Sequence, residues 1–118
     1  MQIIRASETP ADQRPDGREV KYLSEIEINM HVDRIALIEA VHPPNFTEKL
    51  HSHLKTFEVF YFLNPTNYNI NGKDYYINAG DYVVFEPGDV HGAIDIGNKS
   101  RFLILKLPFI ADDKRDEE

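Results

Sequence analysis

Three histidines and one glutamate have the residue types and the spacing of a metal site. His51 and His53 are separated by one residue. On a β-strand their side chains would point to the same face, about 6–7 Å apart, and could converge on one ion. Glu58 follows five residues later, and His91 lies much further along the chain, directly after a predicted turn. Three neutral imidazoles and one carboxylate suit Mn, Fe, Co, Ni or Zn.

The same four residues also permit an interpretation without chemistry. A His-x-His pair alone is a weak indication of a metal site, and a lone histidine after a turn is commonly a surface residue. The spacing therefore leaves open whether an ion is bound. A barrel that closes on itself would bring His91 to the same interior point as His51 and His53, so the answer depends on the fold.

The composition narrows the kind of protein. The chain has 118 residues, which fits one domain, and its 42% hydrophobic content is typical of a soluble globular protein. It contains no cysteine, so a disulfide framework or a thiolate metal site is excluded and any metal must use histidine and carboxylate.

Charge and hydropathy argue against some partners. The net charge of −7 disfavours nucleic acid and anionic membrane surfaces, and no helix-turn-helix pattern is visible. No N-terminal apolar run resembles a signal peptide, and no apolar run approaches the ~20 residues needed to span a bilayer. We therefore expect no nucleic-acid or membrane partner, and a cytoplasmic location.

The chain reads as short strands separated by turn signals. Asn71-Gly72 between two alternating segments is the strongest hairpin signal. No segment forms a convincing amphipathic helix of three turns. Eight to ten strands predict an all-β sandwich or barrel. The expected strands cover residues 20–31, 34–42, 51–53, 58–63, 66–70, 73–77, 82–85, 93–96 and 101–107.

Three regions are expected along the chain. Residues 1–19 are polar, carry a turn at Asp16-Gly17 and predict an irregular N-terminal arm. Residues 20–108 predict the β-barrel. Residues 109–118 form a charged C-terminal tail that we expect to be frayed.

Two segments resemble the two motifs of the cupin superfamily. HSHLKTFEVFYFL matches His-x-His followed after four residues by Glu, and GDYVVFEPGDVH matches Gly-Asp, a short apolar strand, Pro-Gly and His. The resemblance covers about residues 34 to 108, with both motifs in order. It implies a small antiparallel jelly-roll barrel in a single domain. It also implies a metal held by the residues at the four ligand positions, which are His51, His53, Glu58 and His91.

The sequence departs from the cupin pattern at three turn positions. Asn45 and Pro65 stand where the first motif usually has glycine, and both residue types form turns. Glu86 stands where cupins often have proline. It is either an exposed turn residue or a second carboxylate near the rim. These departures concern loop shape and leave the four ligand positions filled.

Further residues are candidates for the walls of a pocket. If Glu58 points inward, Phe60 and Phe62 do so as well, because side chains repeat every two residues on a strand. Arg101 is the basic group that we expect nearest a pocket. His31 and His42 lie outside the motifs, and we expect them to be solvated or hydrogen-bonded rather than ligands. Any one tyrosine of a set of four could line the mouth: Tyr68, Tyr75, Tyr76 and Tyr82.

The resemblance implies several functions, because cupins include isomerases, dioxygenases, decarboxylases and sensing modules. The first hypothesis is a metal-dependent enzyme acting on a small polar metabolite, by isomerisation of a sugar or of a keto or hydroxy acid, or by oxygenation. The alternative is a module that binds or senses a small ligand without turnover. A storage-type barrel ranks last. The sequence assigns no catalytic acid or base and no organic cofactor. We also expect a homodimer, in which the segment around Val20–Met30 adds a strand to the partner's sheet edge.

Overall fold

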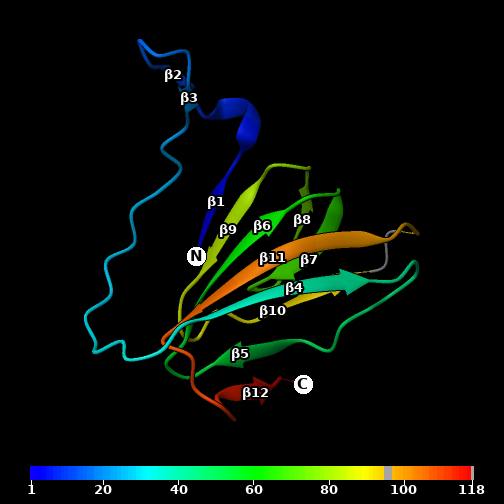
Figure 1. The fold of residues 1–118 in the computed structure, drawn as a ribbon. Coiled ribbons are helices and arrows are strands. Elements are labelled where there is room, and N and C mark those ends of the chain that lie inside the picture. The colour runs from blue at the N-terminus through cyan, green and yellow to red at the C-terminus, as the bar shows by residue number, and fades with distance from the viewer. Residues whose placement is uncertain (95–96, 118) are drawn as a thin grey trace.

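Two five-stranded antiparallel sheets face each other and form a barrel (Figure 1). A computed structural model describes residues 1–94 and 97–117 of the chain. The first sheet has the order β1 (Gln2–Ile4), β9 (Tyr82–Phe85), β6 (Phe57–Phe62), β11 (Ser100–Leu107) and β4 (Ala36–His42). The second has the order β12 (Lys114–Asp116), β5 (His51–His53), β10 (His91–Ile94), β7 (Thr66–Ile70) and β8 (Lys73–Ile77). The predicted all-β fold is confirmed.

The inward faces of the two sheets form one core. Phe60 and Phe62 on β6 are both buried, as the two-residue repeat from Glu58 predicts. Aromatic rings dominate the core, with Phe60 stacked on Phe102 at a centroid distance of 5.2 Å. The buried core residues are Phe60, Phe62, Tyr68, Ile70, Ile77, Val83, Phe85, Ala93 and Phe102.

The predicted hairpin at Asn71-Gly72 is confirmed. β7 and β8 pair antiparallel around this dipeptide, with Thr66 opposite Ile77 at the far end. Asn71 has φ of 52° and Gly72 has φ of 85°. A tight two-residue turn needs positive φ at both positions, which asparagine and glycine tolerate best. The local chemistry of two residues therefore sets the register of this pair of strands.

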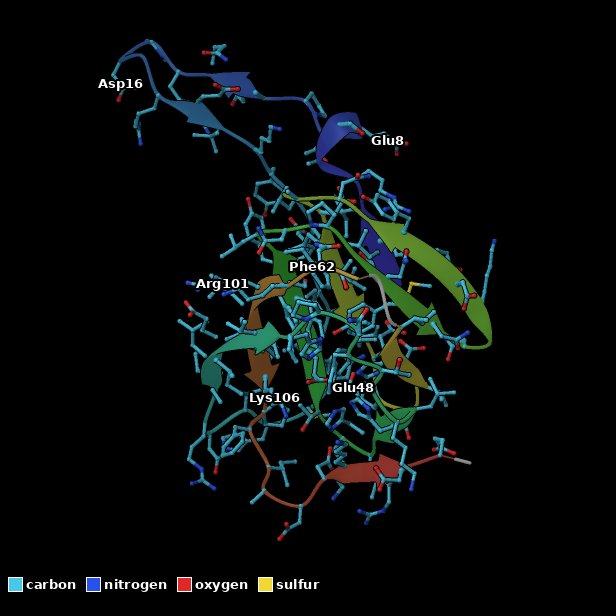
Figure 2. All side chains as sticks on the ribbon, turned by 90° about the vertical axis from the view of Figure 1, so that its right-hand side faces the viewer. Glu8, Asp16, Glu48, Phe62, Arg101 and Lys106 are labelled. Carbon is cyan, nitrogen blue, oxygen red and sulfur yellow. The ribbon has the colours of Figure 1, made fainter. Side chains whose placement is uncertain are left out.

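The N-terminal arm contains more secondary structure than the sequence predicts, and the segment that follows it contains less. β1 pairs with β9, and a turn of 3-10 helix, η1 (Ala6–Glu8), follows it. β2 (Asp12–Gln13) and β3 (Glu19–Val20) then form a hairpin around the predicted turn, and this hairpin projects from the barrel (Figure 2). The strand expected over residues 20–31 is wrong beyond Val20, because residues 21–35 contain no strand. This segment pairs with no strand among the described residues of its own chain.

The charged tail is paired with the barrel, so the expectation of a frayed end is wrong for residues 114–116. β12 pairs with β5, with Lys114 opposite His53 and Asp116 opposite His51. The buried carboxylate of Asp113 accepts hydrogen bonds from the amides of Lys55 and Thr56, both at 3.0 Å. These bonds attach the tail to the barrel through Asp113, a charged residue that composition alone predicts to be exposed to solvent.

Part of one expected strand, the last residue of the tail and the division of the chain into three regions are not tested by the structure. β10 ends at Ile94, and positions 95 and 96 of the strand expected over residues 93–96 lie outside the described residues, as does position 118 of the tail. The division of the chain at residues 19 and 108 stays a prediction. In the part of the chain that the structure describes, no helix is long and apolar enough to cross a membrane.

Candidate metal centre

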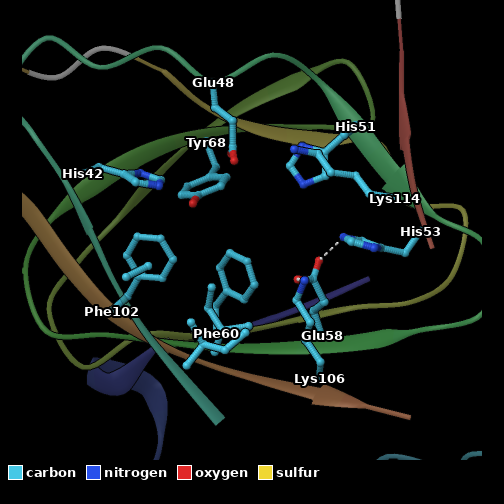
Figure 3. A pocket seen from close by; sticks show the side chains of 13 residues that line it. His42, Glu48, His51, His53, Glu58, Phe60, Tyr68, Phe102, Lys106 and Lys114 are labelled. Atoms are coloured by element: carbon cyan, nitrogen blue, oxygen red, sulfur yellow. Dashed lines mark ion pairs between the residues drawn. The ribbon is translucent and has the colours of Figure 1, made fainter. Parts of the chain in front are cut away.

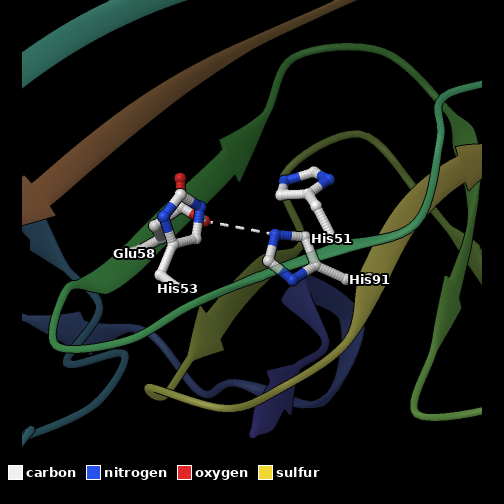
Figure 4. A group of neighbouring side chains, drawn as sticks. All are labelled: His51, His53, Glu58 and His91. Atoms are coloured by element: carbon white, nitrogen blue, oxygen red, sulfur yellow. Dashed lines mark hydrogen bonds and ion pairs between the residues drawn. The ribbon is translucent and has the colours of Figure 1, made fainter. Parts of the chain in front are cut away.

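The four predicted ligands lie together inside the barrel (Figure 4). His51 and His91 are directly opposite each other on β5 and β10, and their ring centroids are 4.4 Å apart. His53 lies two residues further along β5. Glu58 comes from β6 in the other sheet. One ligand atom from each of the four residues lies within 4.8 Å of the others, and all four residues are buried.

Hydrogen bonds from the β7–β8 turn hold the two residues that precede His91. Asn71 Nδ2 donates to Asp89 Oδ1 at 3.0 Å, and the amide of Val90 donates to Asn71 Oδ1 at 2.9 Å. The same asparagine that forms the hairpin turn therefore braces the residues before His91. The ring of His91 also stacks on Phe85, with centroids 4.0 Å apart. Its position is thus held by both polar and aromatic contacts.

Backbone carbonyls determine which ring nitrogen faces the cluster. His51 Nδ1 lies 3.1 Å from the Lys49 oxygen, and His91 Nδ1 lies 3.0 Å from the Asp89 oxygen. A carbonyl oxygen only accepts, so each Nδ1 must carry the hydrogen and donate it. A neutral ring with this tautomer has its lone pair on Nε2. This carbonyl contact is the arrangement that orients histidines which bind metals in proteins.

The carboxylate of Glu58 faces two of these nitrogens. Its Oε1 atom is 2.9 Å from His53 Nε2 and 3.1 Å from His91 Nε2. His53 Nε2 is buried and makes no aligned hydrogen bond in the described part of the chain. His91 Nε2 therefore meets Oε1 in one of two ways: a protonated ring donates a hydrogen bond to the carboxylate, whereas a neutral ring presents a second acceptor and needs a cation between the two atoms. The donor set of this cluster therefore fits a metal ion.

The protonation states also suit a cation. Burial raises the pKa of Glu58, but its contacts with His53 and His91 outweigh burial and hold the pKa below its ordinary value. Two causes lower the pKa of His51: burial is the larger, and the neighbouring His91 is the smaller. An ionised carboxylate and a neutral imidazole are the forms that bind metal.

A lysine lies beside the other oxygen of Glu58. Lys106 on β11 is directly opposite Glu58 on β6, so both side chains point into the barrel. Lys106 Nζ is 3.7 Å from Glu58 Oε2. Oε1 therefore faces the histidines, while Oε2 faces an ammonium group.

The cluster opens on a cavity of about 260 Å³ between the two sheets (Figure 3). Its apolar walls come mainly from the first sheet and include both rings of the Phe60–Phe102 stack. Outside the four-residue cluster its polar wall consists of His42, Glu48, Tyr68, Lys106 and Lys114. The structure thus places further titratable groups around the predicted metal site.

The prediction that Arg101 is the basic group nearest the pocket is wrong. Arg101 does not line the cavity: its exposed side chain lies 3.5 Å from Glu39 on the outer face. Lys106 takes the predicted place. Residues 102, 104 and 106 share one face of β11 and residue 101 lies on the other, because side chains alternate along a strand. Phe102 and Lys106 are four residues apart on one strand and therefore face the same way. The apolar Phe102, expected in the core, was the sequence signal that could have identified Lys106.

The remaining candidates divide between surface and cavity. Tyr68 lines the cavity, whereas Tyr75, Tyr76 and Tyr82 do not. His31 and Glu86 are exposed, as expected. His42 lies outside the cluster, as expected. It is half-buried against the cavity, and its Nδ1 is buried without a hydrogen-bond partner among the described residues.

Sequence comparison matches the chain to no protein-family model and to no curated protein. Solved structures do resemble it. A Klebsiella pneumoniae protein with a double-stranded β-helix domain is 19% identical, with a TM-score of 0.64 over 76% of this chain and 80% of that one. A predicted oxalate decarboxylase from Thermotoga maritima is 25% identical, with a TM-score of 0.59 over 90% and 98%. The DMSP lyase DddQ from Ruegeria pomeroyi is 18% identical, with a TM-score of 0.63. Its match covers 70% of this chain, which spans only 43% of that lyase. Together with a similar cupin protein from Bacteroides fragilis, these likenesses show that the chain has the double-stranded β-helix fold of the cupins.

Proposed function

We propose that this chain is a metal-dependent enzyme that acts on a small polar metabolite. His51, His53, Glu58 and His91 would hold one divalent transition-metal ion, which is Mn, Fe, Co, Ni or Zn. The observation that carries the proposal is the buried carboxylate oxygen of Glu58, which faces two imidazole nitrogens at 2.9 and 3.1 Å beside an open cavity. The bound ion would supply Lewis-acid polarisation of a substrate oxygen or, if redox-active, electrons for oxygenation.

The cavity residues favour proton-transfer chemistry such as isomerisation over oxygenation. Isomerisation needs an acid or base beside the substrate. Glu48, Tyr68 and His42 all line the cavity. Burial, together with the charges of Glu48 and Glu58, raises the pKa of Tyr68 well above its ordinary value, so its hydroxyl stays protonated and can donate. The rings of Phe60 and Phe102 exclude water from one wall.

The similar structures support an enzymatic rather than a storage role. One is described as a predicted oxalate decarboxylase and another as a DMSP lyase. Both descriptions name enzymes acting on small molecules, in agreement with the size of the cavity.

Metal content tests the proposal directly. Purified protein, stripped with a chelator and reconstituted with each of the five metals, should bind one equivalent after dialysis. The double variant H51A/H53A should bind none, because it loses two imidazole ligands. H31A is the matched control, since His31 is exposed and lies outside the cluster. Absence of stoichiometric metal in the reconstituted wild type would overturn the proposal, and full metal in H51A/H53A would overturn the ligand assignment.

Turnover separates the enzyme from a ligand-binding module. Metal-loaded protein should be screened by thermal shift against hydroxy acids, keto acids and sugars, and the compounds that stabilise it should be assayed for conversion. Conversion by the wild type and not by H51A/H53A supports the enzyme. Metal-dependent stabilisation without conversion of any stabilising compound supports the module.

A further inference from the structure

The two ends of the cavity differ in charge. Lys106 and Lys114 lie at the end formed by the metal cluster, whereas His42, Glu48 and Tyr68 lie at the other end (Figure 3). In the same view Phe102 lies below His42, and Phe60 lies between Phe102 and Glu58.

The cluster end attracts an anion. The Lys106 side chain is 24% exposed and its ammonium group is shared with Glu58 Oε2, but an ammonium group has three hydrogens to donate. Lys114 comes from β12, directly opposite His53, and reaches the same cavity from the C-terminal tail. With a divalent ion bound, the two lysines and the ion outweigh the charge of Glu58. This end is then net positive, even when the buried carboxylate of Asp113 near His53 is counted.

The opposite end requires groups that both donate and accept hydrogen bonds. Glu48 is held in place, since its Oε1 accepts from the Ala93 amide at 3.2 Å and its own amide donates to the Ala93 oxygen at 2.9 Å. Its carboxylate still has acceptor capacity. His42 and Tyr68 both line this end of the cavity. Hydroxyl groups are the ligand groups that satisfy a carboxylate, an imidazole and a phenol together.

Resting on the proposed metal-dependent function, we propose that the cavity binds a hydroxylated carboxylate, with its carboxylate at Lys106 and Lys114 and its hydroxyls at His42, Glu48 and Tyr68. An apolar acid would cover Glu48 and His42 without pairing them, and a neutral polyol would leave the lysines unpaired. Each mismatch is penalised, because a desolvated polar group without a partner costs more than a formed hydrogen bond returns. The cavity of about 260 Å³ lies below the roughly 300–1,000 Å³ of sites for drug-sized ligands, so the compound is small.

Three linear six-carbon compounds test the substrate class. Gluconate carries a carboxylate and hydroxyls, sorbitol carries only hydroxyls, and hexanoate carries only a carboxylate. Calorimetric titration of Mn²⁺-loaded protein should show gluconate binding at least ~10-fold more tightly than either analogue, as expected when a hydrogen bond to a charged group is lost. Equal binding of sorbitol or hexanoate would overturn the proposal. Metal content is measured again after titration, because gluconate itself chelates metals.

Single substitutions test the two ends separately. K114Q should weaken gluconate binding about 5-fold, the upper range for a solvent-exposed ion pair, and leave sorbitol binding unchanged. K99Q is the matched control, because Lys99 is exposed and does not line the cavity. E48Q should reduce the advantage of gluconate over hexanoate, since a neutral amide accepts hydrogen bonds less strongly. Gluconate binding in K114Q equal to that in K99Q would overturn the assignment of the lysine end.

The metal measurement separates the two proposals. If the reconstituted protein holds no stoichiometric metal, the proposed function fails whatever the anion binding shows. If metal is held and gluconate has no advantage over its analogues, only the inference about the ligand fails.

Discussion

The amide of Gly88 donates a hydrogen bond to the carbonyl oxygen of His53 at 2.9 Å. The turn of the second motif is therefore attached to the strand of the first, and His91 follows Gly88 after two residues. Gly88 has φ of +91°, a conformation that residues with a Cβ rarely adopt. One backbone bond thus sets the distance between two predicted ligands that are far apart in the sequence.

Replacing Gly88 should disturb both stability and metal binding. G88A should lower the free energy of unfolding by about 1–2 kcal/mol, since a Cβ destabilises positive φ. It should also weaken metal binding, because relaxation of the turn moves His91 away from His53. Urea unfolding and metal titration measure the two effects. G17A is the control: Gly17 also has positive φ, at 94°, but lies in the projecting hairpin. Equal metal affinity in G88A and G17A would contradict the positioning role.

Removing the metal should destabilise the folded barrel. Without the ion, Glu58 Oε1 faces His91 Nε2 at 3.1 Å, a contact that is favourable only if the ring takes up a proton. A ligand at about 1,000 times its dissociation constant stabilises the folded state by about 4 kcal/mol. Addition of a chelator should therefore lower the melting temperature of the wild type and leave that of H51A/H53A unchanged. The idea fails if both proteins respond alike in differential scanning calorimetry.

Local sequence chemistry predicted the parts of this fold that depend on neighbouring residues. Asn71-Gly72 requires a tight turn whatever surrounds it, and the hairpin formed as expected. The two cupin-like motifs placed four ligand candidates, and the structure brings them within 4.8 Å of one another. Residues 21–35 show the limit of the same approach. Their alternation permits a strand, but a strand also needs a neighbouring edge, which alternation does not reveal.

The rest of the cavity depends on pairings between distant strands. Lys106 lies beside Glu58 only because β11 pairs with β6 in that register. Lys114 reaches the cavity only because β12 pairs with β5. No local sequence pattern predicts either pairing, and the charge of the tail predicts exposure to solvent rather than pairing in a sheet. Arg101 lies near the start of its strand, but the alternation of side chains places it on the outer face, where it lies 3.5 Å from Glu39.

Acid should remove a specific stabilising contribution at Asp81. Burial raises the pKa of this carboxyl, but the amides of Ala6 and Asn78 and the guanidinium of Arg5 outweigh burial and lower it below its ordinary value. A pKa lower in the folded than in the unfolded state stabilises the protein above the unfolded value, about 3.9. This stabilisation is lost as the pH falls through the folded pKa.

The variant D81N tests this contribution. At pH 7 its free energy of unfolding should be lower by about 1.5–3 kcal/mol, the value of hydrogen bonds to a charged group. Below pH 4 the difference from the wild type should shrink, which urea unfolding at pH 7 and pH 3 would show. D12N is the control, because Asp12 is exposed. A difference that does not change with pH would mean that Asp81 acts through packing rather than charge.

The outer face of the first sheet leads to a prediction about assembly. β4 is an edge strand of this sheet, and its outward residue Leu37 is 75% exposed, next to Ile35 at 62%. Residues 21–35 meanwhile contain no strand in this chain. Exposed apolar side chains on an unpaired edge are a ready site for association with another chain. We propose a homodimer in which this edge and the 21–35 segment of a second copy pair.

Light scattering should find the wild type as a dimer and L37E as a monomer, because the two new carboxylates would be buried in the interface. Leu37 points out of the barrel, so L37E should keep its metal content, which separates loss of assembly from loss of fold. Y76E is the control: Tyr76 is 54% exposed on β8, in the other sheet, and its substitution should leave the dimer intact. A monomeric wild type, or dissociation of Y76E together with L37E, would contradict pairing through β4.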